Sequence, residues 1–126
     1  MGVSMRAAIS VCAILAAAGC EEVTVLPQAI AGADAGRGRA AIARVGCGAC
    51  HEIPGIPWPQ GRVGPSLEGF ARQALISGQF PNRPDILSLW VRDAPALSPQ
   101  TGMPSMPLSE QEARDVAAYL YTLRAR

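Results

Sequence analysis

The sequence predicts a small all-α domain, and three observations support this. The chain has 126 residues, the size of one domain. Apolar residues recur at helical spacing in several stretches, and none alternates apolar and polar residues over the length of a useful strand. Proline and glycine cluster between these stretches, so long loops should connect the helices. The six aromatic residues are few for a packed core, so something besides side chains is expected to help fill the interior.

Composition and charge exclude several classes of protein. Hydrophobic residues make up 49% of the chain and charged residues 17%, unlike a disordered chain or a coiled coil. The formal net charge is +1, and all 11 basic residues are arginines that form no basic run. Because nucleic-acid binders neutralise phosphates with basic patches, we expect no nucleic-acid partner.

Residues 1–19 have the layout of a bacterial export signal. Arg6 precedes an apolar run of 13 residues, which as a helix would fall short of a ~30 Å hydrocarbon core. The stretch Ala17-Ala18-Gly19-Cys20 resembles a bacterial lipobox. A lipid on Cys20 would anchor the mature chain to the membrane on the periplasmic side. The alternative is cleavage after Ala18, which would leave a soluble periplasmic protein.

The remaining chain divides into a tether and one domain. Residues 20–33 contain Pro27 and no clear helical period, so we expect a tether there and a domain over residues 34–126. Prolines and glycines predict loops over residues 52–65 and 95–106.

Helix signals lie between these loops. The expected helices cover residues 36–45, 69–77, 82–92 and 110–123. Asp34 is a suitable N-cap for the first of them, which should end at Gly46. Asn82 opens the third, and Asp93-Ala94-Pro95 should stop it. The pattern Ser109-x-x-Glu112 is a capping box that begins the last helix.

A five-residue motif directly after the first helix carries the chemistry. Cys47-Gly48-Ala49-Cys50-His51 has the spacing of the c-type haem attachment sequence. Two thiols three positions apart on one turn can add to the two vinyl groups of a haem. The adjacent His51 then supplies the proximal ligand to the iron. The small Gly48 and Ala49 would let the ring lie close to the backbone.

Three other interpretations of this motif are weaker. A structural zinc site needs four ligands, and lipidation of Cys20 would leave only three sulfur or imidazole donors, Cys47, Cys50 and His51. A thioredoxin-like dithiol is expected in a βαβ context, which this sequence lacks. A plain disulfide gives His51 no role.

The number of histidines and methionines limits the choice of the sixth iron ligand. His51 is the only histidine, so two-histidine ligation within one chain is impossible. After removal of the signal, Met103 and Met106 are the remaining thioethers. We expect Met103 to be the distal ligand, with Met106 as the alternative; either could instead be a gap-filling hydrophobe. A His/Met pair raises the reduction potential.

From Gly38 to Leu123 the chain resembles a class I, monohaem c-type cytochrome. The resemblance rests on these motifs: Gly38, Cys47 to His51, Gly64-Pro65-Ser66-Leu67, Asn82 to Asp93, Met103-Pro104 and Val116 to Leu120. It implies an all-α fold wrapped around one covalently bound haem. It also implies that the Pro65 carbonyl accepts a hydrogen bond from His51, that Trp90 lies in the haem pocket, and that Gly38 allows the first and last helices to cross closely. The chain departs from the family in lacking the lysines that mitochondrial relatives use for docking.

A closer resemblance is to cytochrome c domains associated with or fused to subunit II of bacterial haem-copper oxidases. The matching segments are Gly61 to Pro65, Ser77 to Asp85, Trp90 to Asp93 and Pro99 to Pro104. This implies an electron carrier, not an enzyme, with no small-molecule substrate. Its partners would be a quinol oxidoreductase or dehydrogenase upstream and a terminal oxidase downstream.

Two other functions stay open at this point. The chain could be the haem subunit of a periplasmic dehydrogenase complex. An open-site haem enzyme or sensor is the other possibility, although two loop methionines weigh against an open iron.

Docking should be mainly apolar and weakly salt-sensitive, because the mature chain has no lysine and a charge near zero. Trp58 either takes part in it or packs within its loop.

Overall fold

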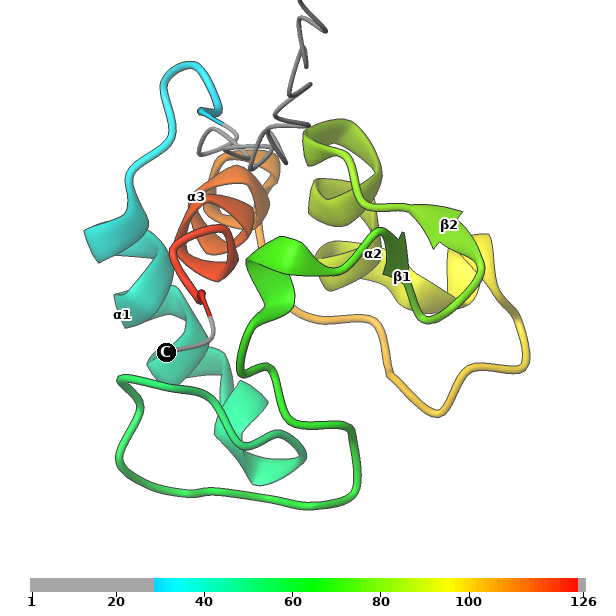
Figure 1. Cartoon of the computed structure of the whole chain (residues 1–126), viewed down its shortest axis with the longest axis horizontal. Coiled ribbons are helices and arrows are strands. Elements are labelled where there is room, and N and C mark those ends of the chain that lie inside the picture. The colour runs from blue at the N-terminus through cyan, green and yellow to red at the C-terminus, as the bar shows by residue number, and fades with distance from the viewer. Residues whose placement is uncertain (1–28, 125–126) are drawn as a thin grey trace, which may run out of the picture.

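Three α-helices carry the fold of residues 29–124, the part of the chain that the computed structural model describes (Figure 1). They are α1 (Ala35–Val45), α2 (Pro84–Leu97) and α3 (Glu110–Leu120). Single 3-10 turns form η1 (Cys47–Ala49) and η2 (Phe70–Arg72), and β1 (Leu75–Ile76) pairs antiparallel with β2 (Phe80–Pro81). The predicted all-α class is confirmed. The predicted export signal, Cys20 and most of the tether lie outside the described residues. Within residues 29–124, no helix is both long and apolar enough to cross a membrane.

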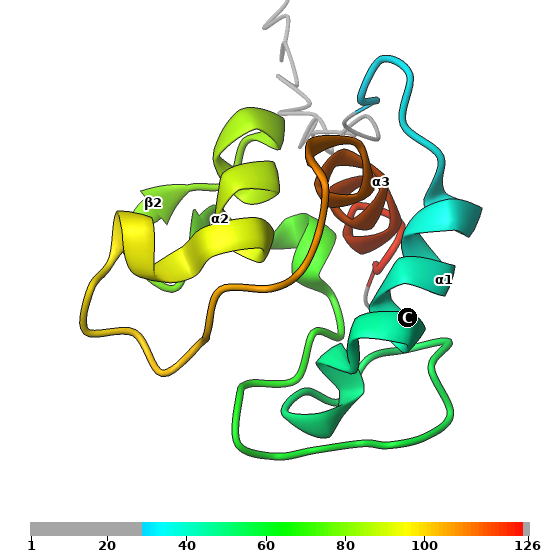
Figure 2. The same cartoon turned by 180° about the vertical axis from the view of Figure 1, so that it is seen from behind.

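Helices α1 and α3 lie side by side and cross at Gly38 (Figure 2). A Cβ atom at Gly38 would lie 1.9 Å from the backbone oxygen of Asp115, so only glycine fits there. Ile42 and Val116, 1% and 2% exposed, pack into the core beside this contact. The close crossing that the family resemblance implied is present.

A buried carboxylate ties the same two helices together. The side chain of Asp115 is 3% exposed, and its two oxygens accept hydrogen bonds from Arg37 Nε at 2.8 Å and Nη2 at 2.9 Å. The backbone N–H of Asp34 and the amide of Gln111 also donate to it, at 2.8 Å and 3.0 Å. Hydrogen bonding to Arg37 lowers the pKa of Asp115 to about 2.

Local capping signals set the ends of α1 and the start of α3 as the sequence predicts. Asp34 Oδ1 accepts a hydrogen bond from the backbone N–H of Arg37 at 2.7 Å, and Gly46 ends α1 with a φ of 79°. Ser109 and Glu112 form the expected capping box. Helix α3 ends at Leu120, before the predicted end at residue 123. The apolar pattern continues beyond the helix because the following turn is also buried, so the pattern alone predicts too long a helix.

The helix predicted over residues 69–77 is wrong. After the single turn of η2, Ser77 and Gly78 adopt φ values of 52° and 68°, and the chain reverses into the β1–β2 hairpin. Asn82 does not cap α2, whose N-cap is Arg83. Its buried side chain instead donates to the Gln73 carbonyl at 2.9 Å and accepts from Tyr121 Oη at 3.1 Å.

Helix α2 breaks where the sequence predicts a stop, and then resumes. Asp93 has non-helical angles, φ −150° and ψ 70°, after which the helix continues to Leu97. Pro95 accounts for the break, because its ring clashes with the carbonyl of the preceding turn and it has no N–H to donate.

Asp115→Asn should destabilise the protein by about 2 kcal/mol at neutral pH, since the asparagine is uncharged like the protonated acid. The folded-state pKa of Asp115, about 2, lies below the ordinary 3.8, so its stabilisation is complete above about pH 4 and is lost as the pH falls toward 2. Urea unfolding of both proteins across this range measures the difference. It should shrink toward zero near pH 2, and a difference that does not depend on pH would contradict the assignment.

Candidate functional site

The cysteine motif forms the turn that follows α1. Gly46 redirects the chain, and the backbone N–H groups of Cys50 and His51 both donate to the Cys47 carbonyl, at 3.2 Å and 3.1 Å. The two cysteines therefore lie on one turn, as their spacing predicts. Both are free thiols and half-buried.

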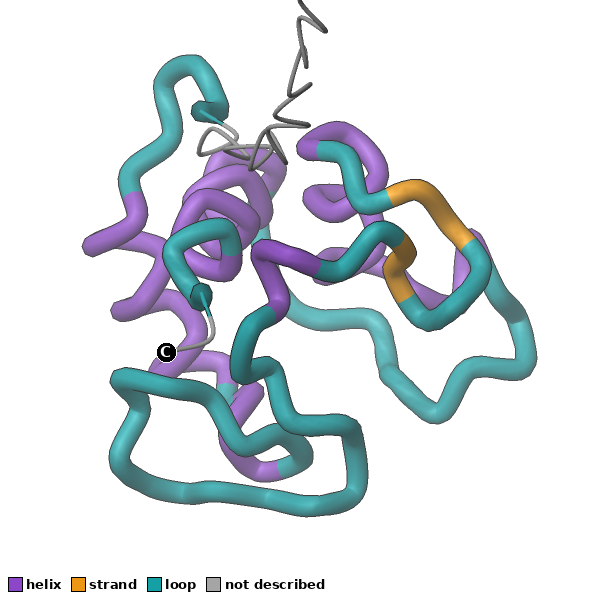
Figure 3. The backbone as a smooth tube through the Cα atoms, in the orientation of Figure 1, coloured by secondary structure: helices purple, strands orange, loops and turns teal. Residues whose placement is uncertain are grey.

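A loop over residues 52–68 folds back onto this turn (Figure 3). Gly61 N–H donates to the Gly48 carbonyl at 2.7 Å, and Gly64 N–H donates to the Cys50 carbonyl at 2.8 Å. A Cβ atom at Gly61 would lie 2.0 Å from the Ala49 oxygen, and one at Gly64 would lie 2.4 Å from the imidazole ring of His51. The loop can approach the motif this closely only because both positions are glycine.

Sequence reasoning missed this use of glycine. That Gly48 lets the haem ring lie close to the backbone stays a prediction, but Gly48 also admits the loop, because a Cβ atom there would lie 2.4 Å from the Pro59 oxygen. Gly61 had no role beyond its place in a matching segment. Two glycines within a proline-rich stretch were the available signal, but the atoms they approach belong to another segment.

The imidazole of His51 is oriented by a backbone carbonyl. Its Nδ1 lies 2.7 Å from the Pro65 oxygen, which is the contact that the resemblance implied. Because a carbonyl oxygen only accepts, Nδ1 is the donor in this contact, and in the neutral imidazole the free lone pair then lies on Nε2. This is the tautomer that a metal ligand needs, with its second nitrogen held by a hydrogen bond.

The environment of Cys47 is not that of a reactive thiol. Burial raises the pKa of the Cys47 thiol, so it is protonated at neutral pH. Redox-active dithiols instead depend on a lowered thiol pKa. Among residues 29–124, no three or more histidine, cysteine, aspartate and glutamate side chains are grouped to hold a metal ion.

The two candidate distal ligands lie in the loop between α2 and α3. Met103 and Met106 are both partly buried against the hydrophobic core. The Met103 N–H donates within the loop, to Thr101 Oγ1 at 3.2 Å, whereas the Met106 N–H donates to the Arg92 carbonyl of α2 at 2.8 Å. The choice of Met103 as ligand stays a prediction.

The two tryptophans differ sharply in exposure. Trp90, on α2, is 8% exposed, and its ring centroid lies 5.8 Å from that of Phe80. Trp58 is 83% exposed in the loop over residues 52–68, so the interpretation that it packs within its loop is wrong. Val63, in the same loop, is 87% exposed.

This donor set fits a covalently attached haem. Two free thiols lie on one turn, the neighbouring imidazole is held through Nδ1 so that Nε2 is available to bind a metal, and a separate loop carries two thioethers. Cys47 and Cys50 would form the thioether bonds, and His51 would bind the iron. Pro65 contributes through its contact with His51.

Comparison with known protein families supports the same conclusion. A family model described as cytochrome c matches residues 35–124. The match includes the cysteine motif, the loop over residues 52–68 and both loop methionines. A search of curated proteins found no match.

Gly64→Ala should disturb the imidazole, because the new Cβ atom would overlap the His51 ring. We expect a loss of roughly 2 kcal/mol in unfolding free energy and a changed absorption spectrum of the haem-loaded protein. Gly102→Ala is the matched control, since a Cβ atom there meets nothing within 4 Å. Equal effects of the two substitutions in urea unfolding and spectroscopy would contradict the role given to Gly64.

Proposed function

The chain belongs to the cytochrome c family, and from this premise we propose that it carries single electrons to a terminal oxidase in a bacterial respiratory chain. Membership of the family gives it a haem electron-transfer role, in which the iron changes between ferric and ferrous states. One attachment motif in 126 residues supports a single haem. The hydrogen bond between His51 and Pro65, beside two free thiols on one turn, is the observation that carries the proposal.

We propose that His51 and Met103 both bind the haem iron and leave it no open coordination position. The Pro65 carbonyl fixes the tautomer of His51 and its ring orientation. The loop methionines are held against the core. If both residues bound the iron, no substrate would need to reach the metal, and little rearrangement would accompany each transfer.

The exposed apolar residues of the loop over residues 52–68 suggest where partners dock. Trp58 and Val63 are almost fully exposed, and their loop is hydrogen-bonded to the cysteine turn. The chain has no lysine and a formal charge of +1, so we propose an apolar contact rather than an electrostatic one. The proposed partners are a quinol oxidoreductase or dehydrogenase upstream and a haem-copper oxidase downstream, on the strength of the sequence resemblance.

We also propose an export signal over residues 1–19 and a lipid on Cys20, supported by the sequence pattern. This would keep the domain on the periplasmic side of the membrane. Ile30, in the predicted tether, packs against the core, so this part of the tether is held to the domain.

Met103→Ala should remove the weak far-red sulfur-to-iron band of the oxidised protein and allow the reduced protein to bind carbon monoxide. Met106→Ala should leave the absorption spectrum unchanged. The reverse result would make Met106 the ligand. A wild-type protein that is high-spin and binds carbon monoxide would contradict the closed carrier and indicate an open-site enzyme or sensor.

Trp58→Ala should slow bimolecular electron transfer to a purified haem-copper oxidase by about tenfold, because exposed tryptophans often dominate apolar contacts. The spectrum should not change. Raising the salt from about 50 to about 200 mM should alter the wild-type rate by less than about twofold. Leu89→Ala is the control, since Leu89 is an exposed apolar side chain on α2. Equal rates for wild type and Trp58→Ala, measured by stopped-flow absorption, would count against this docking surface.

A further inference from the structure

The break in α2 places two hydrogen-bond acceptors against the methionine loop. At Asp93 the backbone leaves the helical conformation, with φ −150° and ψ 70°. The Arg92 carbonyl accepts a hydrogen bond from the Met106 N–H at 2.8 Å, and Asp93 Oδ1 accepts one from Ser105 Oγ at 2.6 Å. Consecutive residues of the loop are thus bound to consecutive residues of the helix.

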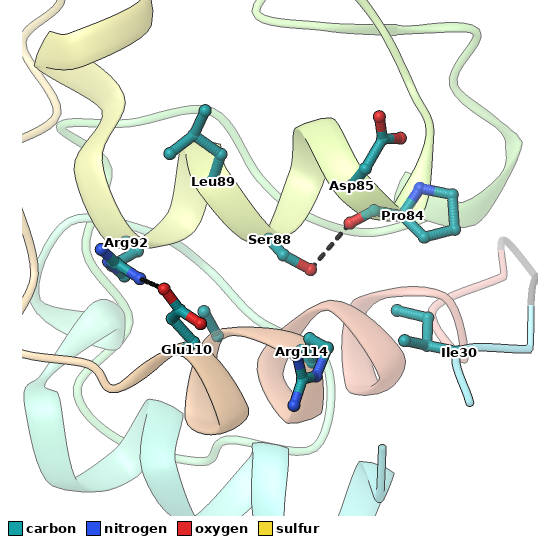
Figure 4. A pocket seen from close by; sticks show the side chains of 9 residues that line it. Ile30, Pro84, Asp85, Ser88, Leu89, Arg92, Glu110 and Arg114 are labelled. Carbon is teal, nitrogen blue, oxygen red and sulfur yellow. Dashed lines mark hydrogen bonds and ion pairs between the residues drawn. The ribbon is translucent and has the colours of Figure 1, made fainter. Parts of the chain in front are cut away.

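The break is also connected to the start of α3. Arg92 Nη1 lies 3.2 Å from Glu110 Oε1, and both residues line a pocket between α2 and α3 (Figure 4). This pair is exposed, so it adds little stability by itself. It nevertheless joins the helix beside the break to the point where the loop ends.

The bonds at Ser105 and Met106 lie two and three residues after Met103. The Met103 N–H itself donates within the loop, to Thr101. The position of its side chain therefore depends on how the following residues are held. A thioether is a weak acceptor and has no charge that would attract it to a metal. Its binding to the iron therefore depends on the loop keeping the sulfur close to the metal.

We propose that Asp93 and Ser105 are positioning residues that hold Met103 in place for axial ligation of the haem iron. The inference rests on the proposed ligation by Met103. Without the Asp93–Ser105 hydrogen bond the loop gains conformations in which the sulfur is away from the iron. An external ligand then competes with it more easily.

The test measures the affinity of the oxidised holoprotein for imidazole, followed by loss of the far-red sulfur-to-iron band. Ser105→Ala and Asp93→Ala should each raise this affinity by about five- to tenfold, and the double variant by no more than either alone. Ser105→Thr keeps the hydroxyl and should restore the wild-type affinity. Ser88→Ala is the matched control, because it removes a serine hydrogen bond on α2, to the Pro84 carbonyl at 2.7 Å, away from the loop.

The outcomes separate this inference from the proposed function. If Met103→Ala removes the band but neither Ser105→Ala nor Asp93→Ala changes imidazole affinity, the positioning role is overturned and Met103 remains the ligand. The same holds if these two variants lower only the unfolding free energy. If Met103→Ala leaves the band intact, the ligand assignment fails, and the positioning role fails with it.

Discussion

The close crossing of α1 and α3 is the contact on which the rest of the structure depends. Gly38 brings the two backbones together, and the buried Asp115 carboxylate joins the start of α1 to the middle of α3 by hydrogen bonds. The crossing sets the direction in which α1 leads into Cys47. It also places Tyr119 of α3, whose hydroxyl donates to the Pro54 carbonyl at 2.6 Å, next to the loop after the cysteine motif. One helix thus leads into the site, and the other holds the loop that covers it.

The histidine and the methionine loop are held by different means. On the histidine side, backbone groups of Gly61, Gly64 and Pro65 contact the motif directly, so little can move without breaking main-chain hydrogen bonds. On the methionine side, the loop is bound where α2 is broken, and one of its two hydrogen bonds joins the side chains of Ser105 and Asp93. An electron carrier benefits from rigidity around its haem, because the residues that bind the iron should stay in place when the iron changes charge.

Much of this protein could be predicted from sequence because the signals are local. The Asp34 cap and the Ser109–Glu112 capping box act within one helical turn, and both are present in the structure. The spacing from Cys47 to His51 is likewise a local signal, because it puts two thiols and an imidazole on one turn and so predicts haem attachment. Local patterns were less reliable where burial overrode them. Asn82 is a residue type that often caps helices, but its buried side chain instead forms hydrogen bonds with Gln73 and Tyr121.

The sequence by itself determined the fold class, both ends of α1 and the start of α3, and it predicts the haem attachment residues and a short set of possible iron ligands. Only the tertiary structure decided that Gly61 and Gly64 admit a returning loop, that Trp58 faces solvent, and that the helix broken near Pro95 holds the methionine loop. The physical reason is distance along the chain. Caps and motifs act between neighbours, whereas a close approach, an exposed ring or a bond between Asp93 and Ser105 depends on segments that meet only after folding.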